Sequence, residues 1–349
     1  MSAPAKPVQL ARLLSDAGAR GGDGGGRPTT TATAAEVVEE LRLWEPRGSQ
    51  PAAGRAGRSA TAHEPLARPR VLLNMACTAD GRATIGGRSG QIGNRADHEL
   101  FHALRTAIDA VLVGAGTMRA ERYGRLVRED SARALRCARG LAQEPLACIV
   151  SASLALPADE IPLLADPAAR VAILTPSPAS LPECAAQVRY VRCAREGQLD
   201  LPAALGELRR AGVRTMLCEG GPHLNAQLLA AGLVDELFLS LAPRLAGGDA
   251  ASESLRIVAG PVLDPPVALE LESVFASEGQ LLLRYRALRA GEPRVEPAGG
   301  GGGAGRAVPS AERPDSSAEG PAPGEKPAPP PAPPSGSPDA PPAESSPPL

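Results

Sequence analysis

Aromatic side chains are scarce in this sequence of 349 residues, where Phe, Tyr and Trp together make up 2%. Long apolar runs are also missing, since no stretch of about 18 apolar residues occurs and the N-terminus lacks the apolar core of a signal peptide. Neither charge sign is in excess, because 37 Lys and Arg stand against 39 Asp and Glu. Nucleic acids and anionic membranes attract proteins through a basic excess. We therefore expect a soluble, cytoplasmic protein that binds neither.

Cysteine and histidine are few and scattered. His98 and His102 lie four residues apart on a predicted helix, a spacing that two metal ligands can use, but the H-E-x-x-H pattern is absent. We expect both to be ordinary helix residues and the protein to hold no metal. The cysteines form no C-x-x-C pair, which favours reduced thiols over disulfides or a zinc site. They are Cys77, Cys137, Cys148, Cys184, Cys193 and Cys218.

Glycine and proline are abundant, with 38 and 37 residues. Residues 291–349 contain no Phe, Tyr, Trp, Ile or Met, so they cannot bury enough apolar surface to fold, and we predict a disordered tail. We predict that residues 1–69 form an N-terminal arm with flexible linkers at 21–33 and 48–62. Within this arm, the spacing of apolar residues over 34–44 predicts a short helix, capped by Thr33, that docks onto the core.

Residues 70–290 show the pattern of one α/β domain. Helical patterns alternate with short apolar strands, and then strands of alternating polarity follow with little helix between them. This order predicts an α/β fold with a mostly parallel central sheet, antiparallel C-terminal edge strands and helices on both faces. Strands are predicted at 71–76, 110–114, 146–150, 171–174, 216–218, 234–241, 267–275 and 280–288, and helices at 94–106, 202–211 and 222–231.

Two junctions between a strand and a helix are rich in glycine. In the first, a strand runs into Gly114-Ala-Gly116-Thr117; in the second, a strand runs into Glu219-Gly220-Gly221. Glycines let a ligand approach the backbone closely, and ligands of open α/β sheets bind at the carboxyl ends of strands. The two junctions could hold one phosphorylated cofactor, although Arg119 stands where a G-x-G-x-x-G fingerprint requires its third glycine. A tight turn and a helix-terminal carboxylate are the structural alternatives.

A polar turn and a group of arginines complete the candidates. The segment 74–89 leaves a buried strand through the turn dipeptide Asp80-Gly81 and enters a glycine-rich loop, which is typical of a pocket rim. The guanidinium fork suits phosphate, but single arginines are more often solvated surface charges. The arginines near the first glycine junction are Arg105, Arg119, Arg122, Arg125 and Arg128.

Several motifs follow one another in a recognisable order between residues 70 and 288. They are Asn74-x-Ala76-x-Thr78-x-Asp80-Gly81-Arg82, Arg105 at a helix end, the strand and junction 109–117, Glu219-Gly220-Gly221-Pro222, the segment 232–237 and Ala242-Pro243. Together they resemble the pyrimidine reductase family of riboflavin biosynthesis, which occurs as the C-terminal half of bifunctional deaminase–reductases and as stand-alone proteins. The resemblance implies a dihydrofolate-reductase-like fold, a homodimer and the cofactor NADPH. It further implies a small phosphorylated substrate, 5-amino-6-(5-phosphoribosylamino)uracil, whose ribosyl group is reduced to the ribityl group.

The resemblance also implies roles for individual residues. The cofactor-binding positions are Ala76, Gly114, Gly116, Thr117, Glu121, Gly220 and Gly221. The substrate-binding positions are Asn74, Ser89, Arg105, Arg128 and Glu219. Asp80 and Glu219 are the candidate catalytic residues, with Asp80 orienting the substrate or relaying a proton. The chain departs from its relatives after residue 120, where it has Glu-Arg-Tyr and they often have Asp-Asp-Pro. Arg119 or Arg122 is our hypothesis for contact with the 2′-phosphate of NADPH.

Two alternative functions stay open at this point. The same fold could reduce another heterocycle, such as a dihydropteridine or dihydrofolate, or it could be a silent nucleotide-binding module whose proline-rich segment recruits partners. The zinc deaminase signature, H-x-E followed by P-C-x-x-C, does not occur in these residues. We therefore expect another protein to carry out deamination.

Overall fold

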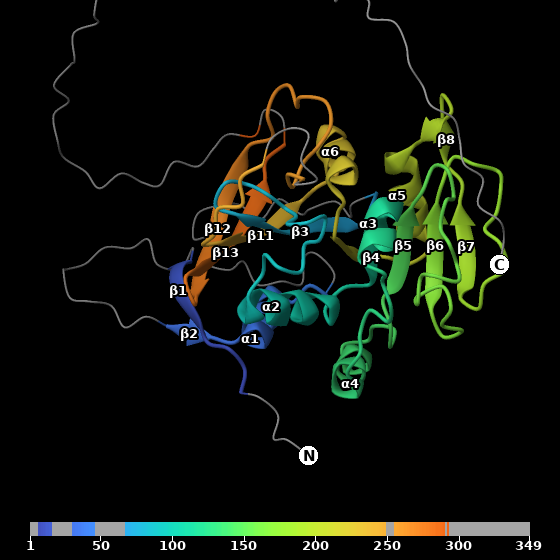
Figure 1. Ribbon diagram of the computed structural model, residues 1–349. Coiled ribbons are helices and arrows are strands. Elements are labelled where there is room, and N and C mark those ends of the chain that lie inside the picture. The colour runs from blue at the N-terminus through green and yellow to red at the C-terminus, as the bar shows by residue number, and fades with distance from the viewer. Residues whose placement is uncertain (1–5, 16–29, 46–66, 249–254, 290–291, 293–349) are drawn as a thin grey trace, which may run out of the picture. The chain divides into compact units, whose positions relative to one another are not determined.

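A computed structural model describes residues 6–15, 30–45, 67–248, 255–289 and 292 of the chain. The predicted linker 48–62, most of the linker 21–33 and, apart from Glu292, the predicted tail lie outside these ranges. Most strands of the described residues join one 11-stranded sheet in the order β2-β1-β12-β13-β11-β3-β10-β4-β5-β6-β7 (Figure 1). None of the described helices is long and apolar enough to cross a membrane.

The strands from β11 to β7 are parallel to one another. Most of them are short runs of buried apolar residues, as expected for strands covered on both faces. Their bounds are β3 Arg70–Thr78, β4 Ala110–Gly114, β5 Leu146–Val150, β6 Arg170–Leu174, β7 Gln187–Val191, β10 Thr215–Cys218 and β11 Glu236–Ala242.

The remaining strands of the sheet pair antiparallel at one edge. β13 (Gln280–Ala287) pairs with β11, and β12 (Leu269–Ser277) pairs with β13. The N-terminal segment then extends this edge with β1 (Leu10–Ser15) and β2 (Thr31–Ala32). A separate short hairpin joins β8 (Ala194–Arg195) to β9 (Gln198–Leu199).

Helices pack on both faces of the sheet and bury two apolar clusters. On one face, α1 (Ala34–Leu41), α2 (Arg95–Arg105) and α3 (Ala115–Ala120) pack against residues such as Leu72 and Leu217. On the other face, α5 (Leu201–Arg210) and α6 (Pro222–Ala230) pack against Leu73 and Cys218. The remaining helix, α4 (Asp130–Ala138), precedes β5 (Figure 1). The predicted α/β class, with a mostly parallel sheet and antiparallel edge strands, is thus confirmed.

The N-terminal residues take part in this fold. Thr33 caps α1 in a capping box, in which its hydroxyl accepts from the backbone N–H of Glu36 while the Glu36 carboxylate accepts from the backbone N–H of Thr33. Val37 and Val38 of this helix belong to the same buried cluster as α2. The helix predicted at 34–44 is present, whereas the strands β1 and β2 were not predicted. The domain boundaries at residues 69 and 290 stay predictions.

Candidate functional site

The predicted site residues gather where three neighbouring parallel strands end. β10 lies between β3 and β4 in the sheet, so their carboxyl ends meet at one edge. Leu72 and Leu217 face the side that carries α2. Because side chains alternate along a strand, Asn74 and Glu219, two residues further along, face that same side. The sheet thus brings the segment that begins at Asn74 and the junction that begins at Glu219 together with the glycine junction at residue 114.

The two glycine junctions pack directly against each other. The backbone N–H of Gly114 donates to the carbonyl of Gly220 at 2.8 Å. A Cβ at Gly221 would lie 2.6 Å from the Thr117 hydroxyl oxygen, and one at Gly114 would lie 3.5 Å from the Gly221 nitrogen. Gly220 has a φ of +86°, in the region that side chains rarely adopt, and the Gly220–Gly221 peptide is cis. The glycines are therefore needed for a close approach of the two backbones.

A buried ion pair joins the second junction to α2. Arg105 donates from Nε and Nη2 to the two carboxylate oxygens of Glu219, each at 2.8 Å, and from Nη1 to the carbonyl of Leu126 at 3.0 Å. The side chains of Arg105 and Glu219 are only 9% and 3% exposed. Such bidentate pairs fix both partners in position. Two predicted substrate residues therefore bind each other in this structure.

Two aromatic residues surround this pair, and neither was among the predicted site residues. The Tyr123 hydroxyl donates to Glu219 Oε2 at 2.7 Å. The Arg105 guanidinium lies over the Phe101 ring at 4.2 Å and near the Tyr123 ring at 5.6 Å from their centroids. Burial and the negative charge of Glu219 raise the pKa of Tyr123 well above its usual value, so its hydroxyl stays protonated and acts as a donor. The pKa of Arg105 is also raised, because attraction to Glu219 outweighs the effect of burial.

Two other predicted residues, Ser89 in the loop after β3 and Glu121 at the end of α3, are hydrogen-bonded to each other. Ser89 donates to Glu121 Oε1 from its hydroxyl at 2.7 Å and from its backbone N–H at 3.1 Å. The loop after β3 is thus tied to the end of α3. Ser89 was predicted to bind the substrate and Glu121 to bind the cofactor, and both roles stay predictions. Ala76 lies on the same strand end as Asn74.

Asp80 has a different environment. It lies on the exposed turn after β3, where its carboxylate accepts from the Thr78 hydroxyl and from the backbone N–H groups of Ala246 and Gly247. These hydrogen bonds, the one from Thr78 first, lower the pKa of Asp80 to about 2. The carboxylate is therefore ionised at neutral pH, and the hydrogen bonds that it accepts join the turn after β3 to the loop after β11. Its catalytic role stays a prediction.

The predicted group of arginines divides in the structure. Arg119 donates to the carbonyl of Ala155 at 2.6 Å, while Arg122 and Arg128 are exposed. After burial, the charges of Arg105 and Arg128 are the main causes that lower the pKa of His102 on α2. Arg128 therefore lies near His102 of α2, and its substrate-binding role stays a prediction.

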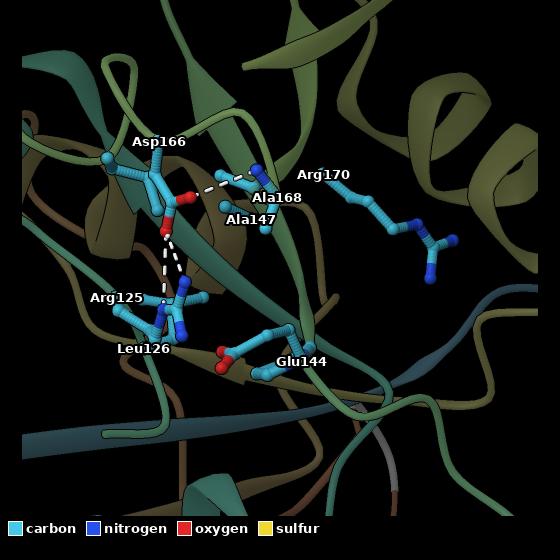
Figure 2. Close-up of a pocket in the computed structure, with 10 residues that line it drawn as sticks. Arg125, Leu126, Glu144, Ala147, Asp166, Ala168 and Arg170 are labelled. Atoms are coloured by element: carbon cyan, nitrogen blue, oxygen red, sulfur yellow. Dashed lines mark hydrogen bonds and ion pairs between the residues drawn. The ribbon is translucent and has the colours of Figure 1, made fainter. Parts of the chain in front are cut away.

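Arg125 belongs to a separate small pocket. Figure 2 shows Arg125 and Asp166 pointing toward each other, with 3.0 Å between Nη2 and Oδ2, while Arg170 points away from them. Asp166 also accepts from the backbone N–H of Ala168, and none of the predicted site residues lines this pocket. Arg125 is paired with Asp166 in this pocket, so the structure gives it a structural role.

The sequence resembles known proteins over the α/β region. Residues 69–283 match the RibD C-terminal domain family. A 2,5-diamino-6-ribosylamino-4(3H)-pyrimidinone 5′-phosphate reductase of Methanothermobacter thermautotrophicus is 30% identical over 225 residues, which cover 62% of this chain and 98% of that protein. The protein of the same name from Archaeoglobus fulgidus is 30% identical over 182 residues, covering 52% and 83%.

A solved structure shows the same fold. A pyrimidine reductase-like protein from Corynebacterium diphtheriae superposes with a TM-score of 0.54 at 26% identity, covering 63% of this chain and 92% of that one.

Proposed function

Since this chain belongs to the RibD C-terminal domain family, we propose that it reduces the ribosyl group of a phosphorylated pyrimidine to a ribityl group in riboflavin biosynthesis. The observation that carries the proposal is the buried Arg105–Glu219 pair directly beside the two packed glycine junctions. This pair and these junctions lie within the part of the chain that matches the family. The archaeal relatives, named as reductases of such a pyrimidine, support it.

NADPH is the proposed cofactor, and the two glycine junctions suit the binding of a dinucleotide. A Cβ at Gly116 would meet no atom within 4 Å, so the backbone there is open to the cofactor, whereas Gly221 is needed because a Cβ there would lie 2.6 Å from the Thr117 hydroxyl oxygen. Gly114, Gly116, Thr117, Gly220 and Gly221 would hold the dinucleotide, with Ala76 and Glu121 at its borders. When bound, NADPH supplies the hydride. For the 2′-phosphate, Arg122 is the better placed of our two candidates, because Arg119 already binds the carbonyl of Ala155.

The residues of the ion pair define the proposed mechanism. Arg105 fixes the carboxylate plane of Glu219 at the carboxyl end of β10, where Glu219 would contact the hydroxyls or the reacting nitrogen of the ring-opened sugar. Asn74 on the neighbouring strand faces the same side, and the exposed Arg128 and Ser89 would bind the sugar phosphate. These contacts would hold the acceptor carbon against the hydride donor, and this positioning would be the contribution of the protein to catalysis.

Two pyrimidines are candidates for the substrate. The sequence resemblance implies 5-amino-6-(5-phosphoribosylamino)uracil, whereas the archaeal relatives are named for the 2,5-diamino compound. The test follows NADPH absorbance with the purified protein and each pyrimidine, with dihydrofolate as a control and NADH as an alternative cofactor. Turnover of one or both pyrimidines with NADPH is the expected result. Turnover of dihydrofolate alone, or tight NADPH binding without turnover of any of the three, would contradict the proposal.

We further propose that the protein acts as a homodimer in the cytoplasm. On β11 and β13, the sheet face opposite to Phe238 and Leu282 carries leucines that are only half-buried, which suits contact with a second copy. They are Leu239, Leu241, Leu281 and Leu283. All six cysteines are free thiols, which suits a reducing compartment.

A further inference from the structure

Tyr123 links the two halves of the candidate site. Tyr123 lies three residues after the end of α3. The residue before it, Arg122, has a φ of +47°, which turns the chain away from the helix. The backbone N–H of Tyr123 donates to the carbonyl of Met118 at 3.4 Å, and its carbonyl accepts from the N–H of Leu163 at 2.8 Å. The main chain of Tyr123 is therefore held on both sides, and its side chain packs against the core cluster of α2.

The Tyr123 hydroxyl contributes one of the three hydrogen bonds that the Glu219 carboxylate accepts from side chains. Oε1 accepts from Arg105 Nε, whereas Oε2 accepts from Arg105 Nη2 at 2.8 Å and from the Tyr123 hydroxyl at 2.7 Å. Both bonds from Arg105 come from one planar group on α2. The Tyr123 hydroxyl adds a donor to Oε2 from another element, the turn after α3, and so ties the carboxylate to that turn as well.

The same short segment also holds the loop after β3. Glu121, two residues before Tyr123, accepts both hydrogen bonds of Ser89. The segment 121–123 is thus bound to the Ser89 loop through Glu121 and to Glu219 through Tyr123. Glu219 in turn directly precedes the Gly220–Gly221 junction. Neither the family match nor the motifs quoted above assign a role to Tyr123.

We infer that Tyr123 is a positioning residue, which acts through Glu219 and fixes its carboxylate and the adjoining junction relative to the turn after α3. The inference rests on the proposed function for its kinetic consequence. The hydroxyl donates to an ionisable group in a buried site, so its loss should have a larger effect than the loss of a surface hydrogen bond.

The variant Tyr123→Phe tests this inference, because it removes the hydroxyl and keeps the ring beside Arg105. Tyr190→Phe is the matched control, since the Tyr190 hydroxyl accepts from the backbone N–H of Leu181 away from the site. We expect kcat/KM for the pyrimidine to fall about 10-fold in Tyr123→Phe, mainly through kcat, with NADPH bound several-fold more weakly. The control should keep wild-type kinetics, and the two variants should melt at similar temperatures. Equal kinetics and NADPH affinity in the two variants would overturn the inference.

A double-mutant cycle separates a positioning role from a general structural one. If Tyr123 acts through Glu219, then adding Tyr123→Phe to Glu219→Gln should cause little further loss, because the carboxylate that it positions is already gone. Fully additive losses would overturn the inference. Absence of turnover in the wild-type protein would contradict the proposed function instead. The same cycle measured on NADPH affinity would then still decide whether Tyr123 and Glu219 act together.

Discussion

Arg105 and Glu219 depend on each other, because each would be a buried charge without its partner. This dependence makes the site sensitive to single substitutions. Tyr123 and Phe101 add a hydrogen bond and a cation–π contact, which keep the pair in one arrangement. The site is therefore held together by residues from α2, the end of β10 and the turn after α3.

Replacing Arg105 by Met should strongly destabilise the protein. Removing one partner of a buried ion pair leaves an uncompensated charge and costs about 3–5 kcal/mol of the free energy of unfolding. Arg95→Met is the control on the same helix, where the pair of Arg95 with Glu99 is half-exposed and its loss should cost roughly 0.5 kcal/mol or less. Urea unfolding of both variants measures the difference. Equal losses would show that the Arg105–Glu219 pair has no special place in the structure.

The residues of the site differ in how far the sequence reveals them. Glu219 and the glycines could be predicted, because a strand, a glycine pair and a helix start follow one another locally. Tyr123 could not, because its hydrogen bond to Glu219 spans 96 residues of sequence. The signal was present only as a departure from the Asp-Asp-Pro run of relatives. The mutual binding of Arg105 and Glu219 was also hidden, because both fit a substrate role equally well as separate residues.

Among the elements, helix α3 offers a direct test of whether NADPH binds at the first glycine junction. Gly116 lies inside α3, and a Cβ there would meet no atom within 4 Å. Gly116→Ala should therefore raise the free energy of unfolding by about 0.5–1 kcal/mol, as for other helical glycines. If NADPH approaches this backbone, the same variant should bind NADPH more weakly, which a fluorescence titration measures.

Gly206→Ala in α5 is the control for this variant, because a Cβ there makes only an ordinary contact of 3.7 Å with the carbonyl of Ala67. It should change stability in the same direction and leave NADPH affinity alone. Unchanged NADPH affinity in Gly116→Ala would exclude Gly116 from the cofactor site.

Three strands are joined by a buried carboxylate that makes the fold sensitive to acid. Glu236 on β11 forms ion pairs with Arg70 on β3 and Arg284 on β13. Burial alone would raise the pKa of Glu236, but attraction to Arg284 and Arg70 outweighs it and lowers the pKa to about 2. A carboxyl whose pKa is lower in the folded state stabilises the protein above its unfolded value near 4.5, and this contribution is lost as the pH falls toward 2.

Glu236→Gln should therefore be less stable than the wild type by about 3 kcal/mol near pH 6, with the difference shrinking as the pH falls toward 2. Urea unfolding between pH 2 and pH 6 checks this. The control is Asp130→Asn, since the Asp130 carboxylate is 96% exposed and its variant should follow the wild-type curve. A difference for Glu236→Gln that stays constant over this range would contradict the assigned pKa.

The predicted strands and helices of the α/β region were all confirmed, because their patterns are local. The strands β1 and β7 were missed for different reasons. β1 lies between segments rich in glycine and proline, and it pairs with β12 more than 250 residues later along the chain, so tertiary contact decides its structure. β7, Gln187–Val191, is a short strand at the sheet edge with exposed positions, and it gives a weak apolar signal.

For the molecule as a whole, a charged substitution on the proposed dimer face tests whether two copies associate there. Leu283→Arg places a cation among the half-buried leucines of β11 and β13 and should convert a dimer of twice the 35.6-kDa chain into a folded monomer. Val262→Arg is the control, because Val262 is 91% exposed and outside this face. Light scattering gives the mass, and circular dichroism shows whether the variant is folded. A wild-type monomer, or a dimer that survives Leu283→Arg, would contradict the proposal.

The most direct test of the central claim compares the wild type with Glu219→Ala in NADPH-dependent reduction of the two pyrimidines. The account predicts that the wild type consumes NADPH with at least one of them and forms the ribityl product. Glu219→Ala should be less stable, because it leaves Arg105 buried without its partner. The account predicts that it loses most of this turnover under conditions in which circular dichroism shows it to be folded and a titration shows that it binds NADPH. Undiminished turnover in Glu219→Ala would contradict the assignment of the Arg105–Glu219 pair to the active site.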